Sequence, residues 1–196
     1  LTVIKMFGSA NSLSLLAIPY FVIAGNIIMK ARITDKLVNF ADAAVGWLPG
    51  GLGHVNVLTS MIFGGIQGSG CADAAAIGGM LIPAMEKQGY DKDYSVAVTA
   101  GSSMLSPIIP PSIAMILYSY YTEVPVGRLF MGALVPGILL GLLQMGVVYL
   151  EYRLRKYDIP RTRFSLRNLL TTAWHSLGAL MMPLIILSGI CFGIVT

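Results

Sequence analysis

Two apolar segments, each interrupted in its middle, constrain this chain more than any other feature. The first, residues 50–83, is broken by several glycines and by polar Gln67, Ser69 and Asp73. The second, residues 94–121, is broken by the sequence SPIIPPS. Such breaks leave backbone groups without helical partners, which a membrane tolerates only inside protein or beside a hydrated cavity. The two breaks are therefore the predicted functional region.

The composition indicates a helical membrane protein. Of 196 residues, 56% are apolar and 11% are charged, and the mean hydropathy is +0.76. Soluble domains carry about 25% charged residues. The apolar runs are continuous and do not alternate residue by residue, which favours helices over an outer-membrane barrel. We therefore predict an all-α, multi-pass protein of the inner membrane.

The pattern of apolar runs divides the chain into four predicted regions. Residues 1–49 hold a membrane span near 13–29 and an amphipathic surface helix over 33–47. Residues 50–122 hold a re-entrant hairpin, with its tip near 68–71, and a helix unwound at its prolines. Residues 123–168 hold a span over 129–149, with a Gly137 and Gly141 packing pair, and a basic linker. Residues 169–196 open a second, incomplete repeat.

Charge and a weak repeat predict how the chain crosses the membrane. Six of the 13 Lys and Arg residues lie in the linker 151–167, and basic clusters favour the cytoplasm. With that linker inside, a re-entrant hairpin also places Lys30, Arg32 and Lys36 inside. LAIPYFVIAGNI near the start resembles LMMPLIILSGIC near the end, and the two would cross in opposite senses. Inverted repeats characterise secondary transporters, although chance similarity between apolar segments remains an alternative.

The residues at the breaks suit an alkali cation. Glycines at the hairpin tip expose backbone groups, and Gln67, Ser69 and Asp73 add hard oxygen donors. The unwound stretch would leave carbonyls near Ser106, Ile109 and the prolines without partners. Two compatible roles could account for Asp73 in a membrane segment: ion-site electrostatics and capping of the second hairpin arm. The alternative for both breaks is that glycine and proline only permit tight packing and kinks.

Other function classes fit the sequence poorly. A serine hydrolase is disfavoured because Gln67 stands where the pattern G-x-S-x-G around Ser69 requires glycine. A channel is disfavoured because no ring of like charge or repeated filter motif is visible in the sequence. Two cysteines and two histidines offer no metal cluster, and no cofactor is expected. The clustered basic charge indicates topology, so no nucleic-acid partner is expected.

The residues at the two breaks resemble a known transporter family. GGIQGSGCADAAAIGGMLIPAMEKQGYDKDYSVAVTAGSSMLSPIIPPSIAMILY is similar to the signature of the large, DctM-like membrane subunit of TRAP (tripartite ATP-independent periplasmic) transporters. LLAIPYFVIAGNIIM and GGLGHVNVLTSMIFGG also match, so the resemblance covers nearly the whole chain. The most specific motifs are GSGCADAAAIG and PIIPPS.

The resemblance implies a function, partners and a site. It implies an elevator-type, sodium-driven importer of small organic acids, such as carboxylates or sialic acid, in the bacterial inner membrane. The implied partners are a small (Q-type) membrane subunit, a periplasmic substrate-binding protein and the lipid bilayer. The implied sodium ligands are Gln67, Gly68, Ser69, Gly70, Ser106, Ile109 and Pro111. A second set is assigned to the substrate site or to the hairpin cap: Asp73, Ser102, Ser103 and Ser112.

Two departures and one truncation qualify the resemblance. The family commonly has serine where Gln67 stands and glycine where Ser106 stands, so backbone coordination is expected to matter more than the Gln67 side chain. Family members are roughly twice as long, so this chain is expected to be a fragment lacking a second hairpin and a second ion site. The alternative function is a carrier of the wider ion-transporter class that works without a binding protein.

Overall fold

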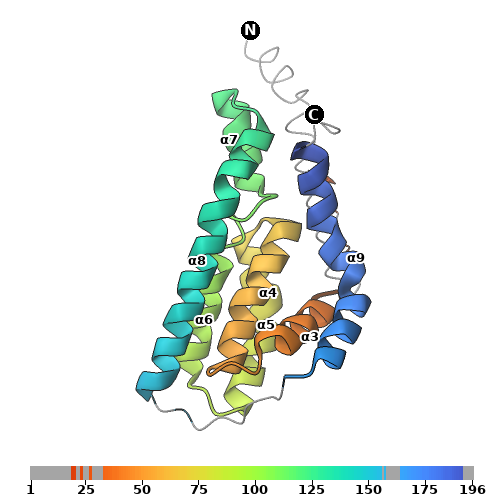
Figure 1. The fold of residues 1–196 in the computed structure, drawn as a ribbon. Helices are drawn as coiled ribbons and strands as arrows, with labels where there is room; N and C mark the ends of the chain where they lie inside the picture. The colour runs from red at the N-terminus through yellow and green to blue at the C-terminus, as the bar shows by residue number, and fades with distance from the viewer. Residues whose placement is uncertain are drawn as a thin grey trace.

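The structure is a computed structural model that describes residues 33–155, 157 and 164–191, and isolated positions 19, 20, 23 and 27. In this part of the chain every regular element is a helix. The all-α prediction is confirmed for this part, while the predicted span 13–29 lies almost wholly outside it. Figure 1 shows α8 and α9 on opposite sides of a core of α4, α5 and α6, with α3 across its base. The helices are α3 (Ile33–Val45), α4 (Gly51–Gln67), α5 (Gly70–Lys87), α6 (Lys92–Ser103), α7 (Ile113–Thr122), α8 (Val126–Arg155) and α9 (Leu166–Cys191).

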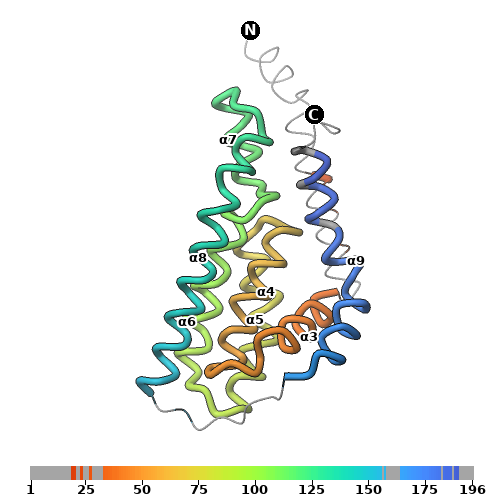
Figure 2. The backbone as a smooth tube through the Cα atoms, in the orientation of Figure 1, coloured from red at the N-terminus to blue at the C-terminus, as the bar shows by residue number. Residues whose placement is uncertain are grey.

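Helices α4 and α5 form a helical hairpin, joined by a tight turn at Gly68 and Ser69. Gly68 ends α4 with φ +62°, and Ser69 is extended with φ −124°. Glycine adopts the left-handed conformation without a Cβ penalty, so the chain reverses within two residues. Figure 2 shows α4 and α5 running side by side from this tip. The structure holds no bilayer, so the re-entrant placement of the hairpin stays a prediction.

Helices α6 and α7 are the two halves of the predicted broken helix. Residues 104–112 between them form turns and bends without a regular helix. Pro107, Pro110 and Pro111 have no backbone N–H to donate, and each proline disfavours a helical conformation of the residue before it. The unwound stretch therefore lies where the proline run predicted it.

Helix α8 is longer than the predicted span over 129–149. It covers 30 residues, and within the described ranges it alone is long and apolar enough to cross a membrane. The Gly137 and Gly141 pair packs closely, as predicted: a Cβ on Gly137 would lie 3.0 Å from Ile109, and one on Gly141 would overlap Met61. Small residues thus bring α8 against both the hairpin and the unwound stretch.

The apolar face of helix α3 packs against protein, and the predicted place of α3 at the membrane surface stays a prediction. Leu37 and Ala41 are fully buried, and α3 packs against α4 and α9. Ser176 on α9 donates a 2.9 Å hydrogen bond to the carbonyl of Lys36. The hydrophobic period predicted the helix, but it could not distinguish a lipid surface from two neighbouring helices as the partner of that face.

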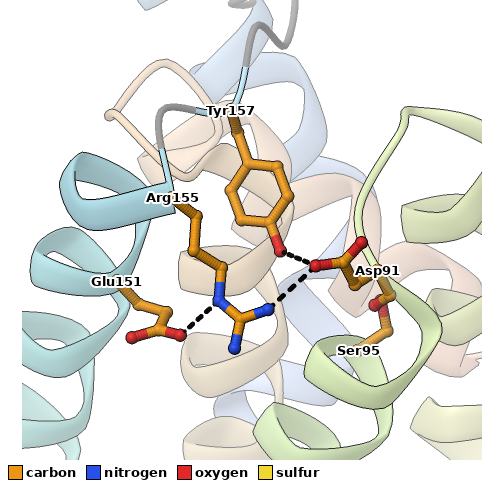
Figure 3. A network of polar contacts seen from close by, with 5 residues as sticks. All are labelled: Asp91, Ser95, Glu151, Arg155 and Tyr157. Atoms are coloured by element: carbon orange, nitrogen blue, oxygen red, sulfur yellow. Dashed lines mark hydrogen bonds and ion pairs between the residues drawn. The ribbon is translucent and has the colours of Figure 1, made fainter.

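A polar cluster ties the α5–α6 turn to the end of α8. Arg155 pairs with Asp91 at 2.8 Å and with Glu151 one helical turn earlier, and Tyr157 donates to Asp91 at 2.9 Å (Figure 3). Partial burial and the hydrogen bond to Asp91 raise the pKa of Tyr157, so this phenol stays protonated above its usual range. The charged turn and the C-terminal end of α8 therefore lie at the same end of the molecule.

We expect Asp91→Asn to lower stability only slightly, because both partners of the Arg155 pair are about half exposed. Exposed pairs contribute roughly 0.2–1 kcal/mol and are screened by salt. The measurement is thermal unfolding of the full-length protein in detergent at low and at about 1 M KCl. The deficit should disappear at high salt, and Asp93→Asn, two residues further along the chain, should show none. A deficit that persists at high salt would contradict this account.

Candidate functional site

One face of α4 meets the broken helix along its whole length. Asn56, Ser60, Gly64 and Gly68 recur every four residues, which places them in one row on the helix surface. We call this row the α4 stripe. All four of its residues are buried. Its first half is polar and faces α6, and its second half is glycine and faces the unwound stretch.

The glycine half of the α4 stripe lets the two breaks touch. A Cβ on Gly64 would lie 2.7 Å from the Cα of Ser106, and one on Gly68 would lie 2.6 Å from the carbonyl oxygen of Pro111. On the far side of the tip, a Cβ on Gly70 would lie 2.9 Å from the Ser103 carbonyl oxygen. Real Cβ atoms do not approach so closely, so only glycine allows this packing. The two sequence breaks thus form one location in space.

Asp73 joins the hairpin to the unwound stretch by a side-chain contact. Its Oδ2 accepts a 2.8 Å hydrogen bond from the Ser106 hydroxyl, and its side chain is fully buried. Its Oδ1 has no hydrogen-bond partner. Neither Asp73 oxygen accepts from a backbone amide, and Ser69 occupies the N-cap of α5. Asp73 nevertheless lies in the first turn of α5, where the helix dipole stabilises a carboxylate, so its capping role stays a prediction beside the ion-site role. A buried carboxylate with a free oxygen suits an approaching cation.

Some backbone oxygens of the unwound stretch are also without partners among the described residues. In the described part of the chain, no hydrogen bond reaches the carbonyls of Ser106, Ile109 or Pro111, three of the predicted sodium ligands. The Gln67 side chain is buried and its Oε1 is unpartnered. Hard oxygen atoms of this kind are what an alkali cation requires. The donor set therefore fits the ion that the sequence implied.

The remaining predicted residues lie close by but are engaged differently. Ser69 links the two hairpin helices and is partly exposed. Ser103 donates to the Ala100 carbonyl at 2.8 Å, and Ser112 donates to the Pro107 carbonyl at 2.7 Å. These hydroxyls stabilise the broken helix itself, and their predicted contact with substrate stays a prediction.

Three residues missed at the sequence level, Asn56, Ser60 and Thr99, form a buried polar network with Ser102, whose predicted contact with substrate stays a prediction. Asn56 Nδ2 donates to Thr99 Oγ1 at 2.7 Å, Ser102 Oγ donates to Asn56 Oδ1 at 2.9 Å, and Ser60 Oγ donates to Ser102 Oγ at 3.1 Å. The signal was present as the four-residue spacing of Asn56 and Ser60 and the three-residue spacing of Thr99 and Ser102. Each spacing alone is common, and only the pairing of α4 with α6 gives it meaning.

Comparison with known proteins identifies the family of this arrangement. All 196 residues match the model of the tripartite ATP-independent periplasmic transporter, DctM component. The chain belongs to the DctM family. The family consists of transporter permeases, so the enzyme class that the motif analysis disfavoured is excluded.

Curated relatives of this DctM-family chain carry transport names. It is 37% identical over 97% of its length to the sialic acid TRAP transporter permease SiaT of Haemophilus influenzae. It is 38% identical over 98% to the C4-dicarboxylate TRAP transporter large permease DctM of Pseudomonas aeruginosa, and 38% over 97% to the isethionate permease DctMQ of Oleidesulfovibrio alaskensis. The chain covers 31%, 45% and 30% of these relatives, so it spans less than half of each.

We expect Gly64→Ala to destabilise the full-length permease, because its Cβ would force the backbone at Ser106 away from α4. Overpacking of this kind costs roughly 1–3 kcal/mol. The matched control is Gly79→Ala on α5, where a Cβ meets nothing within 4 Å. That control should be neutral, or stabilising by up to about 1 kcal/mol through helix propensity. Thermal unfolding in detergent distinguishes the two variants, and equal stability of both would argue against the close contact.

Proposed function

We propose that this chain is the first half of the large membrane subunit of a sodium-coupled TRAP importer for a small organic acid. The observation that carries the proposal is the meeting of the two breaks. The hairpin tip packs against an unwound stretch whose carbonyls at Ser106, Ile109 and Pro111 are free among the described residues. The Ser106 hydroxyl of that stretch donates a hydrogen bond to Asp73, whose Oδ1 lacks a partner. Irregular backbone lining a polar site between broken helices is the usual construction of secondary transporters.

Sodium is the coupling ion that best suits this donor set. The proposed ligands are the carbonyls of Ser106, Ile109 and Pro111 with groups of the tip at residues 67–70. The Asp73 carboxylate supplies the negative charge that offsets the cation's cost of leaving water. Because serine stands at 106, its hydroxyl can orient Asp73 toward the ion. The Gln67 side chain is not required, since backbone oxygens of the tip are available.

The substrate class follows from the relatives' names and from charge. The named relatives transport sialic acid, C4-dicarboxylates or isethionate, which are all organic acids. An anionic substrate beside a bound cation gains electrostatic stabilisation in a low-dielectric site. Ser102, Ser103 and Ser112 are the nearby hydroxyl groups proposed to contact it, or to order the backbone that does.

The proposed assembly and placement extend beyond this chain. The partners are a small Q-type membrane subunit and a periplasmic binding protein, in the bacterial inner membrane. One relative is named DctMQ, which suggests that the two membrane subunits can share a chain. The hairpin would enter from the cytoplasm, and an inverted repeat beyond residue 196 would supply the other half of an elevator-type transport domain.

We expect the full-length permease, reconstituted in proteoliposomes with its small subunit, to take up an organic acid only with both a sodium gradient and its binding protein. Omitting either should reduce uptake to the level of empty vesicles. Uptake of free substrate without the binding protein would instead identify the alternative carrier. Uptake that ignores the sodium gradient would contradict sodium coupling.

We expect Asp73→Asn to abolish sodium-dependent uptake while the protein still inserts and folds. Asparagine keeps the size of the side chain and can still accept from Ser106, but it removes the charge that offsets the cation. The matched control is Asp35→Asn, another carboxylate in the first turn of a helix. Uptake and thermal unfolding should be measured for both variants. Sodium-dependent uptake by Asp73→Asn at the wild-type rate would remove the carboxylate from the site.

A further inference from the structure

The buried network between α4 and α6 lies outside the proposed ion site, yet it continues the same face of α4. Asn56 is fully buried, and Thr99 and Ser102 are 3% and 1% exposed. The network joins α4 to α6 through the bond between Asn56 and Thr99, which are 43 residues apart in the sequence. The polar half of the α4 stripe ends at Ser60, one turn before Gly64 begins the contact with Ser106.

Asn56 uses both ends of its side-chain amide. The nitrogen donates to Thr99 Oγ1 and lies 3.9 Å from the Met85 sulfur of α5, while the oxygen accepts from Ser102. Thr99 in turn donates to the Ser95 carbonyl at 2.8 Å, so its hydroxyl is both donor and acceptor. A satisfied buried network of this kind favours one arrangement of its helices over shifted ones.

The order of residues along the α4 stripe makes the register consequential. A shift of α4 by one turn, about 5.4 Å, would bring Ser60 to the place of Gly64. The serine Cβ would then meet the backbone of Ser106, where a Cβ on Gly64 lies 2.7 Å from Cα. The same shift would separate Asn56 from Thr99 and Ser102. The hydrogen bonds at one end of the α4 stripe and the glycine contacts at its other end therefore favour the same register of α4 against the broken helix.

We propose that Asn56 and Thr99 are positioning residues that fix α4 against α6 and thereby set the affinity of the site at the tip. They do not touch the ion. Their hydrogen bonds fix the separation of α4 from α6 and the position of α4 along its own axis. In that position Gly68, at the end of α4, contacts the Pro111 carbonyl. This inference rests on the proposed sodium-coupled function.

General helix association is the competing explanation. Interhelical hydrogen bonds in membranes contribute only about 0.6 kcal/mol on average, so a purely structural role predicts a small loss of stability and nothing more. A positioning role predicts in addition a change in how much sodium the site needs. The two explanations differ in the sodium concentration at half-maximal uptake per folded transporter.

The most informative variant is Asn56→Leu, because it leaves no buried hydroxyl without a hydrogen-bond partner. Ser102 can donate instead to the Thr99 carbonyl, 3.1 Å away, and Thr99 keeps its bond to Ser95. Thr99→Val is the second variant, and Thr99→Ser is its conservative partner because it keeps the hydroxyl. The matched control is Thr59→Val: Thr59 is fully buried on α4, and its hydroxyl has no hydrogen-bond partner.

The experiment measures uptake by the reconstituted full-length permease across a sodium titration, normalised to folded protein, together with thermal unfolding at each sodium concentration. Asn56→Leu and Thr99→Val should raise the half-maximal sodium concentration roughly 3- to 30-fold, the range seen for residues that couple to a distant site. Thr99→Ser and Thr59→Val should match the wild type. The sodium dependence of unfolding should shift in parallel.

The outcomes separate this inference from the function on which it rests. If the wild type shows no sodium dependence, the proposed function fails. If the wild type depends on sodium but Asn56→Leu and Thr99→Val keep its half-maximal concentration, the positioning role is wrong, whatever their stability. An equal shift in Thr59→Val would also overturn it, because any buried change on α4 would then have the same effect.

Discussion

The close approach of α4 to the unwound backbone is the constraint on which the other features depend. A broken helix in a membrane leaves carbonyls without partners, and such groups need protein or a polar site beside them. Glycine at 64 and 68 allows the backbone of residues 106–112 to come into direct contact with the hairpin. A larger side chain at either position would separate the breaks. The free oxygens would then lie apart, and no single cation could use both sets.

The breaks were predictable from sequence because their causes are local. Gly68 turns the chain through a positive φ, and the proline run removes donors, whatever lies around them. The partners were not predictable in the same way. The hydrophobic period of α3 predicted its buried face but not that α4 and α9 cover it, and Asn56 had no visible partner until α6 was placed beside it. Asp73 was singled out from the sequence, but its bond to Ser106 became visible only once the unwound stretch was placed beside α5.

The two halves of the α4 stripe have different roles: one fixes the position of α4 against α6, and the other lets the unwound backbone approach closely. Its polar half forms directional bonds, which depend on a particular arrangement of α4 and α6. Its glycine half forms no side-chain bonds and leaves the carbonyl oxygens of Ser106, Ile109 and Pro111 in the unwound stretch free. If hydroxyl or amide side chains filled the whole stripe, they would occupy those oxygens. If glycine filled it, nothing directional would hold the two helices in register.

The charge balance at the tip connects ion binding to the geometry of the site. Asp73 has one oxygen bonded to Ser106 and one without a partner, in a place that excludes water from its side chain. A buried carboxylate with so few donors is costly unless a cation or a proton neutralises it. In the proposed importer, sodium would meet that need and bridge the hairpin to the unwound stretch. The tip would then be most stable when the ion is bound, and an anionic substrate beside it would gain from the same positive charge.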